Sequence, residues 1–152
     1  MYTLLELSSE LTAHRLPPLP GPPTLLATVP TLAQRAPPPD GDAMLAAEVL
    51  APPPNAAFPA ARVYVSNRND PAPGGDTIAV FDADGAPRYV GEVRSGLRHL
   101  RGMVFGGPDD RWLVAGGVMG GGVKVFERVE EGKGLREIAA VSLEAPTGFL
   151  WL

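Results

Sequence analysis

Short runs of alternating apolar and polar residues recur along this chain and set the expectation for its fold. One example is RVYVSNR at residues 62–68, and another is TIAVFD at residues 77–82. A period of two places successive side chains on opposite faces of a β-strand, whereas the 3.6-residue period of an amphipathic helix is hard to find here. We therefore predict an all-β chain with strands near residues 2–7, 10–15, 24–29, 46–51, 62–67, 77–82, 88–93, 102–106, 111–116, 122–128 and 135–142.

Residues that break regular structure divide the chain into two parts. Twelve of the 18 prolines fall between Leu16 and Asn55, and 16 of the 18 glycines lie at or after Gly74. Proline cannot donate to a strand ladder and fixes φ, so the first part is expected to carry a Pro-rich loop or polyproline insertion. The glycines of the second part are expected in turns between strands.

The predicted strands also repeat. RVYVSNR at residue 62 aligns with RWLVAGG at residue 111, an offset of 49 residues, and IAVF at 78 aligns with VKVF at 123, an offset of 45. This spacing is typical of one four-stranded blade of a β-propeller. A third copy, YTLLELSSELTAHR, starts at Tyr2 and is followed by the Pro-rich insertion.

We therefore predict a partial β-propeller in a single incomplete domain, with about two complete four-stranded antiparallel blades and the trailing strands of a third. The proposed division is 1–36 for the trailing strands and the insertion, 37–98 for one blade, and 99–152 for the last blade with a C-terminal closing segment.

The repeat brings chemically active residues to equivalent places. We expect each blade to run from an inner strand such as GMVFG to a second strand such as RWLVAG, and then to a third and an outer strand. Glu6, Arg68 and Gly117 then occupy equivalent ends of second strands, and Arg101 precedes an inner strand at the same end. A carboxylate and a guanidinium from neighbouring blades are expected to face one ligand there.

Composition narrows the classes of partner. The chain has 152 residues, no cysteine and a formal net charge of −4 with both signs mixed, which argues against a nucleic-acid or basic membrane surface. No apolar run approaches the roughly 20 residues of a membrane span. The acidic N-terminal stretch MYTLLELSSE and the lack of cysteine favour a cytoplasmic location.

The sequence offers neither a metal-ligand cluster nor a nucleophile elbow, so we expect no metal and no cofactor. VMGGGVKV at residues 118–125 lacks the Lys-Ser/Thr and the helix of a phosphate-binding loop, and is interpreted as a tight hairpin.

The ordered motifs resemble the lactonase family of seven-bladed β-propellers, which includes 6-phosphogluconolactonases and carboxymuconate-cyclising enzymes. The resemblance rests on ELSSELTAHR, AAEVL, YVSNR followed by DTIAVF, HLRGMVF before GGPDDRWLVAGG, and the terminal APTGFLWL. Seven blades need well over roughly 300 residues. The resemblance therefore implies a C-terminal fragment of such a propeller.

The resemblance also implies site residues. The family's proposed catalytic set is a His, an Arg, a Glu after a second strand and an Arg in the SNR position, and only the last two map here, as Glu6 and Arg68. Glu6 is expected to act as general base on water and Arg68 to anchor the phosphate or carboxylate of a small lactone. Because the family's His and other Arg do not map, we expect the chain by itself to be weak or inactive.

Weaker substrate-binding candidates are Arg101, His99, Asn67 and Glu48. Each has a plainer interpretation. Glu6 and Arg68 would simply pair with each other or with solvent, Asn67 would be a turn residue that bonds its own backbone, and Glu48 would be a solvated strand carboxylate. The alternative functions are a carboxymuconate-cyclising enzyme or a non-catalytic interaction module, and the oligomeric state is not predicted.

Overall fold

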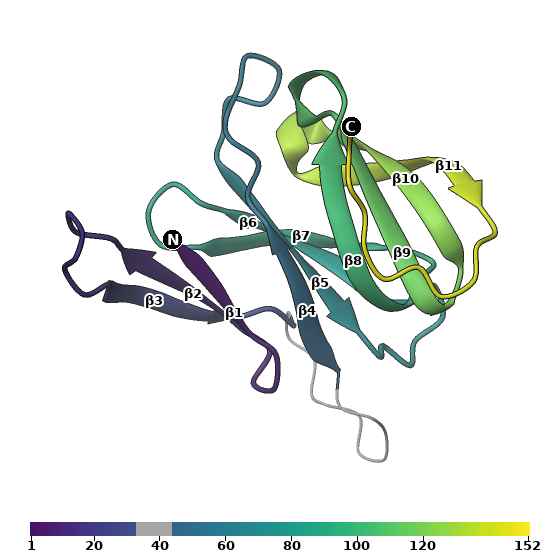
Figure 1. Ribbon diagram of the computed structural model, residues 1–152, viewed down its shortest axis with the longest axis horizontal. Coiled ribbons are helices and arrows are strands. Elements are labelled where there is room, and N and C mark those ends of the chain that lie inside the picture. The colour runs from purple at the N-terminus through teal and green to yellow at the C-terminus, as the bar shows by residue number, and fades with distance from the viewer. Residues whose placement is uncertain (33–43) are drawn as a thin grey trace.

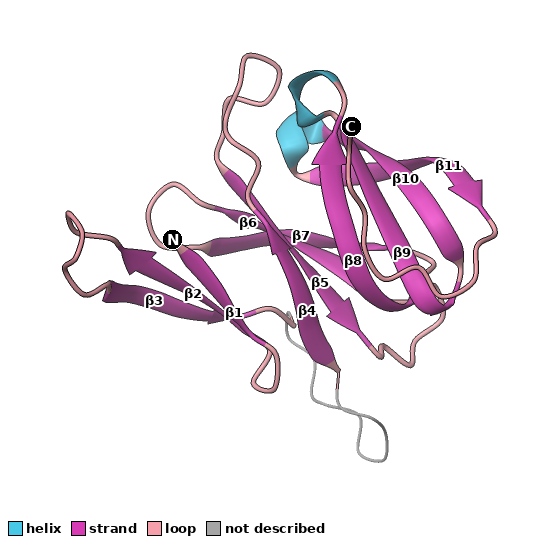
Figure 2. Ribbon diagram, viewed as in Figure 1, coloured by secondary structure: helices cyan, strands magenta, loops and turns pink. Residues whose placement is uncertain are grey.

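The computed structural model describes residues 1–32 and 44–152 and contains, in that part of the chain, eleven β-strands and two short 3-10 helices (Figures 1 and 2). The strands are β1 (Tyr2–Leu5), β2 (Glu10–Arg15), β3 (Thr24–Pro30), β4 (Leu45–Leu50), β5 (Arg62–Arg68), β6 (Thr77–Asp82), β7 (Arg88–Arg94), β8 (Arg98–Gly106), β9 (Trp112–Gly120), β10 (Gly122–Val129) and β11 (Gly134–Val141). The helices are η1 (Pro108–Asp110) and η2 (Glu130–Gly132). Each predicted strand is present, and β8 begins four residues before the predicted start.

The strands form three antiparallel sheets in which chain neighbours are also sheet neighbours. We call them sheet A (β1-β2-β3), sheet B (β4-β5-β6-β7) and sheet C (β8-β9-β10-β11). The predicted order of strands within a blade is the order found. The chain is a partial β-propeller with two four-stranded blades and three strands of another. The proposed boundary at residues 36 and 37 lies outside the described residues, and the division into three units stays a prediction.

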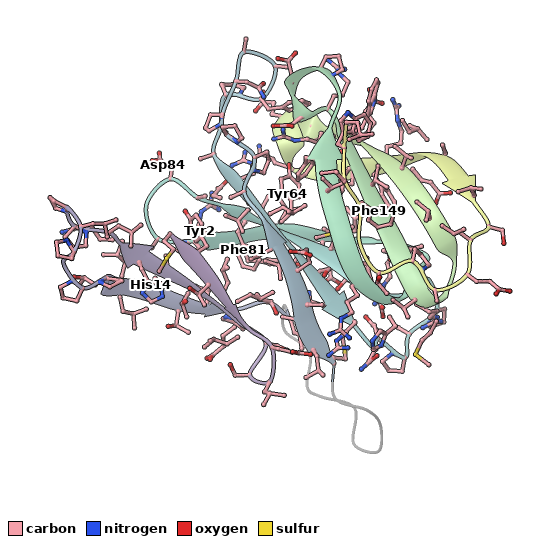
Figure 3. The ribbon with its side chains drawn as sticks, in the orientation of Figure 1. Tyr2, His14, Tyr64, Phe81, Asp84 and Phe149 are labelled. Atoms are coloured by element: carbon pink, nitrogen blue, oxygen red, sulfur yellow. The ribbon has the colours of Figure 1, made fainter. Side chains whose placement is uncertain are left out.

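Sheet B is buried on both faces because it lies between the other two sheets. Val63 and Val65 of β5 pack with Leu11 and Phe81 in the core between sheets A and B. The intervening Tyr64 points the other way, into the core between sheets B and C (Figure 3). Burying one such side chain contributes about 1.5–3 kcal/mol, so the two cores fasten the sheets face to face. This face-to-face packing agrees with the predicted partial propeller.

A buried arginine joins the second core to the loop before β5. The Arg128 guanidinium lies 3.9 Å from the ring centre of Phe58 and also faces the rings of Tyr64 and Phe105. Its Nε donates to the Tyr64 hydroxyl at 3.1 Å, and that hydroxyl donates to the Gly132 carbonyl at 2.6 Å. Burial raises the pKa of Tyr64, which keeps the hydroxyl protonated as a donor.

The C-terminal segment 142–152 runs over the face of sheet C that points away from sheet B (Figures 1 and 3). Glycines on β8 and β9 make room for it. A Cβ at Gly106 would lie 2.0 Å from the Trp151 ring, and a Cβ at Gly116 would lie 2.6 Å from the Phe149 ring. Because these two residues are glycines, Phe149 and Trp151 can lie against the sheet and cover this end of the stack.

Candidate functional site

The edge of the stack at which β5 ends and β8 begins carries most of the predicted site residues, and we call it the rim. Glu6 follows directly after β1, and Arg68 is the last residue of β5. Arg68 Nη2 forms an ion pair with Glu6 Oε1, with the Arg68 side chain 11% exposed and the Glu6 side chain 49% exposed. The expected proximity of these two residues is found, and it joins sheet A to sheet B.

Sheet C adds an imidazole to the same arginine. Arg68 Nη1 lies 2.7 Å from His99 Nε2, and His99 Nδ1 lies 2.9 Å from Asn69 Oδ1. The fold therefore brings Glu6, Arg68, His99 and Asn69 into one continuous set of contacts that spans three sheets. We call these four residues the rim cluster.

The backbone of β8 explains how His99 reaches Arg68. Leu100 is opposite Gly117 while Gly102 is opposite Gly116, and the ladder is also shifted between residues 98 and 100. His99 and Arg101 thus fall at irregular positions of the ladder. Such bulges re-aim side chains, and they are frequent next to functional sites. Arg101 is exposed, and His99 is half-buried.

A loop framework holds the end of β5 against the start of β8. The Asp76 carboxylate accepts the backbone N–H of Asp70 at 3.0 Å through Oδ1 and that of Leu100 at 2.7 Å through Oδ2. Arg98 Nη1 donates to the Asp70 carbonyl at 2.7 Å, and Arg94 pairs with the Asp70 carboxylate at 2.8 Å. These bonds hold Asp70, which follows Asn69, and Leu100, which follows His99. They therefore fix the contact between Asn69 and His99.

Asn67 does not lie in a turn, contrary to the sequence interpretation. It is a residue of β5 and is completely buried. Its Oδ1 accepts the Thr31 hydroxyl at 2.8 Å, and its Nδ2 donates to the Thr31 carbonyl at 3.1 Å. The alternation of apolar residues ends at Asn67, which resembles the end of a strand. Its backbone pairs with Ala46 and Thr77 in the sheet, and its side chain bonds to a residue 36 positions away, which no local pattern reports.

Glu48 is half-buried on β4, where the ladder with β5 is shifted between Ala46 and Val49. Burial raises the pKa of the Glu48 carboxyl, and a hydrogen bond with the Val49 backbone partly offsets this rise. The Glu48 backbone N–H donates to the Ser66 hydroxyl at 3.0 Å. Glu48 is thus partly withdrawn from water, which differs from the solvated strand carboxylate of the plainer interpretation.

Sequence reasoning missed Asn69 altogether. Asn69 has φ of 65° and His99 has φ of 56°, and both are in the left-handed region that non-glycine residues rarely adopt. Asparagine tolerates the left-handed conformation better than most residues. An Asn directly after a predicted strand is therefore a weak signal for left-handed backbone at that residue. The contact itself joins residues 30 positions apart.

Within residues 1–32 and 44–152, His, Cys, Asp and Glu side chains form no group of three or more suited to a metal ion. Over the same part of the chain, no helix has the length and apolar character needed to cross a bilayer.

Four-stranded antiparallel sheets in simple chain order, stacked face to face, are typical of the blades of a β-propeller. The family described as "Lactonase, 7-bladed beta-propeller" matches residues 1–151. This chain therefore belongs to the lactonase family of seven-bladed β-propellers. A search of curated proteins returned no significant match.

Solved structures of the same fold come from several bacteria. A Bacteroides fragilis protein, provisionally described as a 6-phosphogluconolactonase, superposes with a TM-score of 0.73 at 19% identity, over 97% of this chain and 37% of that one. A Lactobacillus plantarum protein gives a TM-score of 0.74 at 20% identity, over 97% of this chain and 40% of that one. The periplasmic gluconolactonase of Pseudomonas aeruginosa gives 0.72 at 20% identity, over 96% and 37%. The chain thus spans 37–40% of the length of these structures.

Proposed function

We propose that the rim cluster is part of a site that binds an anionic sugar lactone and hydrolyses it, with 6-phosphogluconolactone as the substrate class. The observation that carries the proposal is the contact of Arg68 with both Glu6 and His99, which places a carboxylate, a guanidinium and an imidazole at one edge of the stack. Membership of the lactonase family supports it.

In this proposal Arg68 anchors the substrate. A planar guanidinium donates two parallel charge-assisted hydrogen bonds to a phosphate or carboxylate. Glu6 is 49% exposed at its side chain and competes for the same guanidinium. An arriving anion therefore displaces Glu6 from Arg68, which leaves the Glu6 carboxylate available to water.

Glu6 is then the general base. It takes a proton from a water molecule whose oxygen attacks the lactone carbonyl carbon. The ring C–O bond then breaks, and the leaving alkoxide takes this proton back from Glu6 to give the hydroxy acid. Proton removal by a positioned base contributes typically about 10²–10⁴-fold to such a rate.

The weaker candidates enter the proposal in different ways. Arg101 is exposed beside the rim cluster and is proposed as a second cation toward the substrate, with His99 as a rim contact. Glu48 is proposed to lie near the bound substrate. Asn67 is proposed to support the site indirectly, because its bond to Thr31 holds the strand that ends in Arg68.

Activity of this chain alone is proposed to be weak or absent. The family's proposed His and second Arg have no counterpart that we can map onto its residues, and catalytic residues that act as a unit do not each keep a share of the rate. A cytoplasmic location also stays a proposal and rests on the sequence without cysteine.

The test uses the 152-residue chain and measures binding first. Isothermal titration calorimetry with 6-phosphogluconate, the product of the proposed reaction, compares the wild type with Arg68→Met. Loss of a hydrogen bond to a charged group costs about 1.5–3 kcal/mol, so affinity should fall by about ten- to 150-fold. The control is Arg88→Met, an exposed arginine paired with Asp82 at the other end of sheet B, which should bind as the wild type does.

Hydrolysis of 6-phosphogluconolactone above its spontaneous rate is measured on the same proteins and on Glu6→Gln. Any activity of the wild type should be lost in Glu6→Gln, whose binding of the product should persist. Binding that is unchanged in Arg68→Met, or hydrolysis by the wild type that persists in Glu6→Gln, would contradict the proposed function.

A further inference from the structure

Two contacts of His99 favour one tautomer of its ring. Arginine carries only donors, so the Arg68 Nη1 that lies 2.7 Å from His99 Nε2 must donate to it. Asn69 Oδ1 is an acceptor, so His99 Nδ1, at 2.9 Å, must carry the hydrogen. A neutral imidazole with its hydrogen on Nδ1 and its lone pair on Nε2 satisfies both contacts at once.

We propose that Asn69 and His99 are positioning residues for Arg68, an inference that rests on the proposed function of the rim cluster. Asn69 selects the Nδ1–H tautomer of His99, and His99 Nε2 then holds one amino group of the guanidinium. The other amino group is left toward Glu6 and, when Glu6 is displaced, toward the anion.

A neutral acceptor suits this task better than a carboxylate. Glu6 neutralises the guanidinium while it is paired with it, and an anion must take its place. His99 holds Arg68 without a negative charge, so it neither repels the anion nor cancels the positive charge that attracts it. Arg68 thus keeps its orientation when Glu6 leaves, and less side-chain freedom is lost on binding.

The local backbone is shaped for this contact. Asn69 and His99 both hold left-handed φ values although neither is glycine, and His99 falls at an irregular position of the β8 ladder. The Asp76 carboxylate accepts the backbone N–H of the next residue in each case, Asp70 after Asn69 and Leu100 after His99. Non-glycine residues persist in such conformations only where the surrounding structure holds them there.

Three variants separate the side chains from the backbone. Asn69→Gly keeps the left-handed backbone and removes the acceptor oxygen. Asn69→Asp keeps an acceptor oxygen and tolerates the same backbone. His99→Asn also tolerates it and is too short to reach Arg68. All three are compared with the wild type and with Arg68→Met by thermal unfolding, so that loss of fold is recognised.

The first measurement is the ¹⁵N chemical shifts of the His99 ring by NMR at neutral pH, which distinguish the two tautomers without any ligand. The wild type should show the Nδ1–H form, Asn69→Gly a mixture, and Asn69→Asp a protonated Nδ1 again. The inference is overturned by an Nε2–H tautomer in the wild type, or by Asn69→Gly with shifts identical to those of the wild type.

The second measurement is the affinity for 6-phosphogluconate. Asn69→Gly and His99→Asn should bind about three- to tenfold more weakly, because Arg68 loses a support and keeps its own bond to the anion, and Asn69→Asp should recover part of the loss. If Arg68→Met loses affinity while Asn69→Gly and His99→Asn do not, the inference fails and the proposed function stands. If Arg68→Met keeps full affinity, the proposed function fails, and the ring shifts alone decide whether Asn69 sets the tautomer of His99.

Discussion

Thr31 and Asn67 hold sheets A and B together through two reciprocal hydrogen bonds between completely buried groups. The Thr31 hydroxyl donates to Asn67 Oδ1 at 2.8 Å, and Asn67 Nδ2 donates to the Thr31 carbonyl at 3.1 Å. Thr31 follows the last strand of sheet A, and Asn67 precedes Arg68 on β5. The residue beside the proposed anchor is thus a structural link between two blades.

Asn67→Ala should destabilise the chain by about 2–4 kcal/mol, because the Thr31 hydroxyl and carbonyl lose their partner in a buried place. Urea unfolding followed by circular dichroism measures the change. Thr24→Ala, at an exposed position of β3, is the control and should change the free energy of unfolding by less than about 0.5 kcal/mol. A loss below about 1 kcal/mol in Asn67→Ala would mean that the link contributes little.

Asp76→Ala should loosen the start of β8. It removes the acceptor of the Asp70 and Leu100 backbone N–H groups, and a buried donor without a partner costs about 1–3 kcal/mol. Hydrogen exchange should show a loss of protection at the Leu100 amide. Asp84→Ala, at an exposed turn position visible in Figure 3, serves as the control. Unchanged protection of Leu100 in Asp76→Ala would refute this prediction.

Gly106→Ala should displace the C-terminal segment from sheet C. The new methyl group would overlap the Trp151 ring, so the ring has to shift, and its arrangement with the Trp112 ring, whose centre is 6.1 Å away, changes. Near-ultraviolet circular dichroism and tryptophan emission should both change. Gly91→Ala, whose Cβ would meet no atom within 4 Å, should leave both spectra as they are. Identical spectra for Gly106→Ala and the wild type would show that the segment does not cover this face.

Glu48→Gln should stabilise the chain at neutral pH. Burial raises the pKa of Glu48 in the folded chain above its ordinary value near 4.5, so the folded state binds the proton more tightly than the unfolded state does. The contribution of Glu48 to stability is therefore fully present below pH 4.5 and is lost as the pH rises through the folded-state pKa.

Thermal unfolding of the wild type and of Glu48→Gln from pH 4 to pH 7 tests this. The advantage of the glutamine variant should grow with pH and then level off above the folded-state pKa. Glu10→Gln on β2 is a control for the loss of a carboxylate elsewhere. An advantage that is constant over the whole range would contradict the prediction.

Much of the fold follows from local patterns. The alternation in RVYVSNR and TIAVFD predicted β5 and β6 at nearly their observed bounds, because the side-chain period of a strand is a property of neighbouring residues. The repeat offset predicted that Glu6 and Arg68 share one edge of the stack, since equivalent positions in successive blades lie at the same end.

Other features depend on residues that are far apart in the chain. Asn67 ends the predicted strand and has a side chain typical of a turn, yet it is paired within a buried sheet and its side chain bonds to Thr31. His99 was recognised as a residue of the rim, while its contacts with Arg68 and Asn69 were not. These depend on bulges in β8 and on left-handed backbone at both residues.

The sequence by itself determined the β-strands, their order within each blade and the edge at which charged residues gather, because these follow from a two-residue period and a blade-length repeat. Only the tertiary structure decided which donor meets which acceptor at that edge. A hydrogen bond forms or fails within a few tenths of an ångström. That precision comes from the packing of three sheets and from the bonds of Asp76 to Asp70 and Leu100. They bring Arg68, Asn69 and His99 together across about 30 residues of chain.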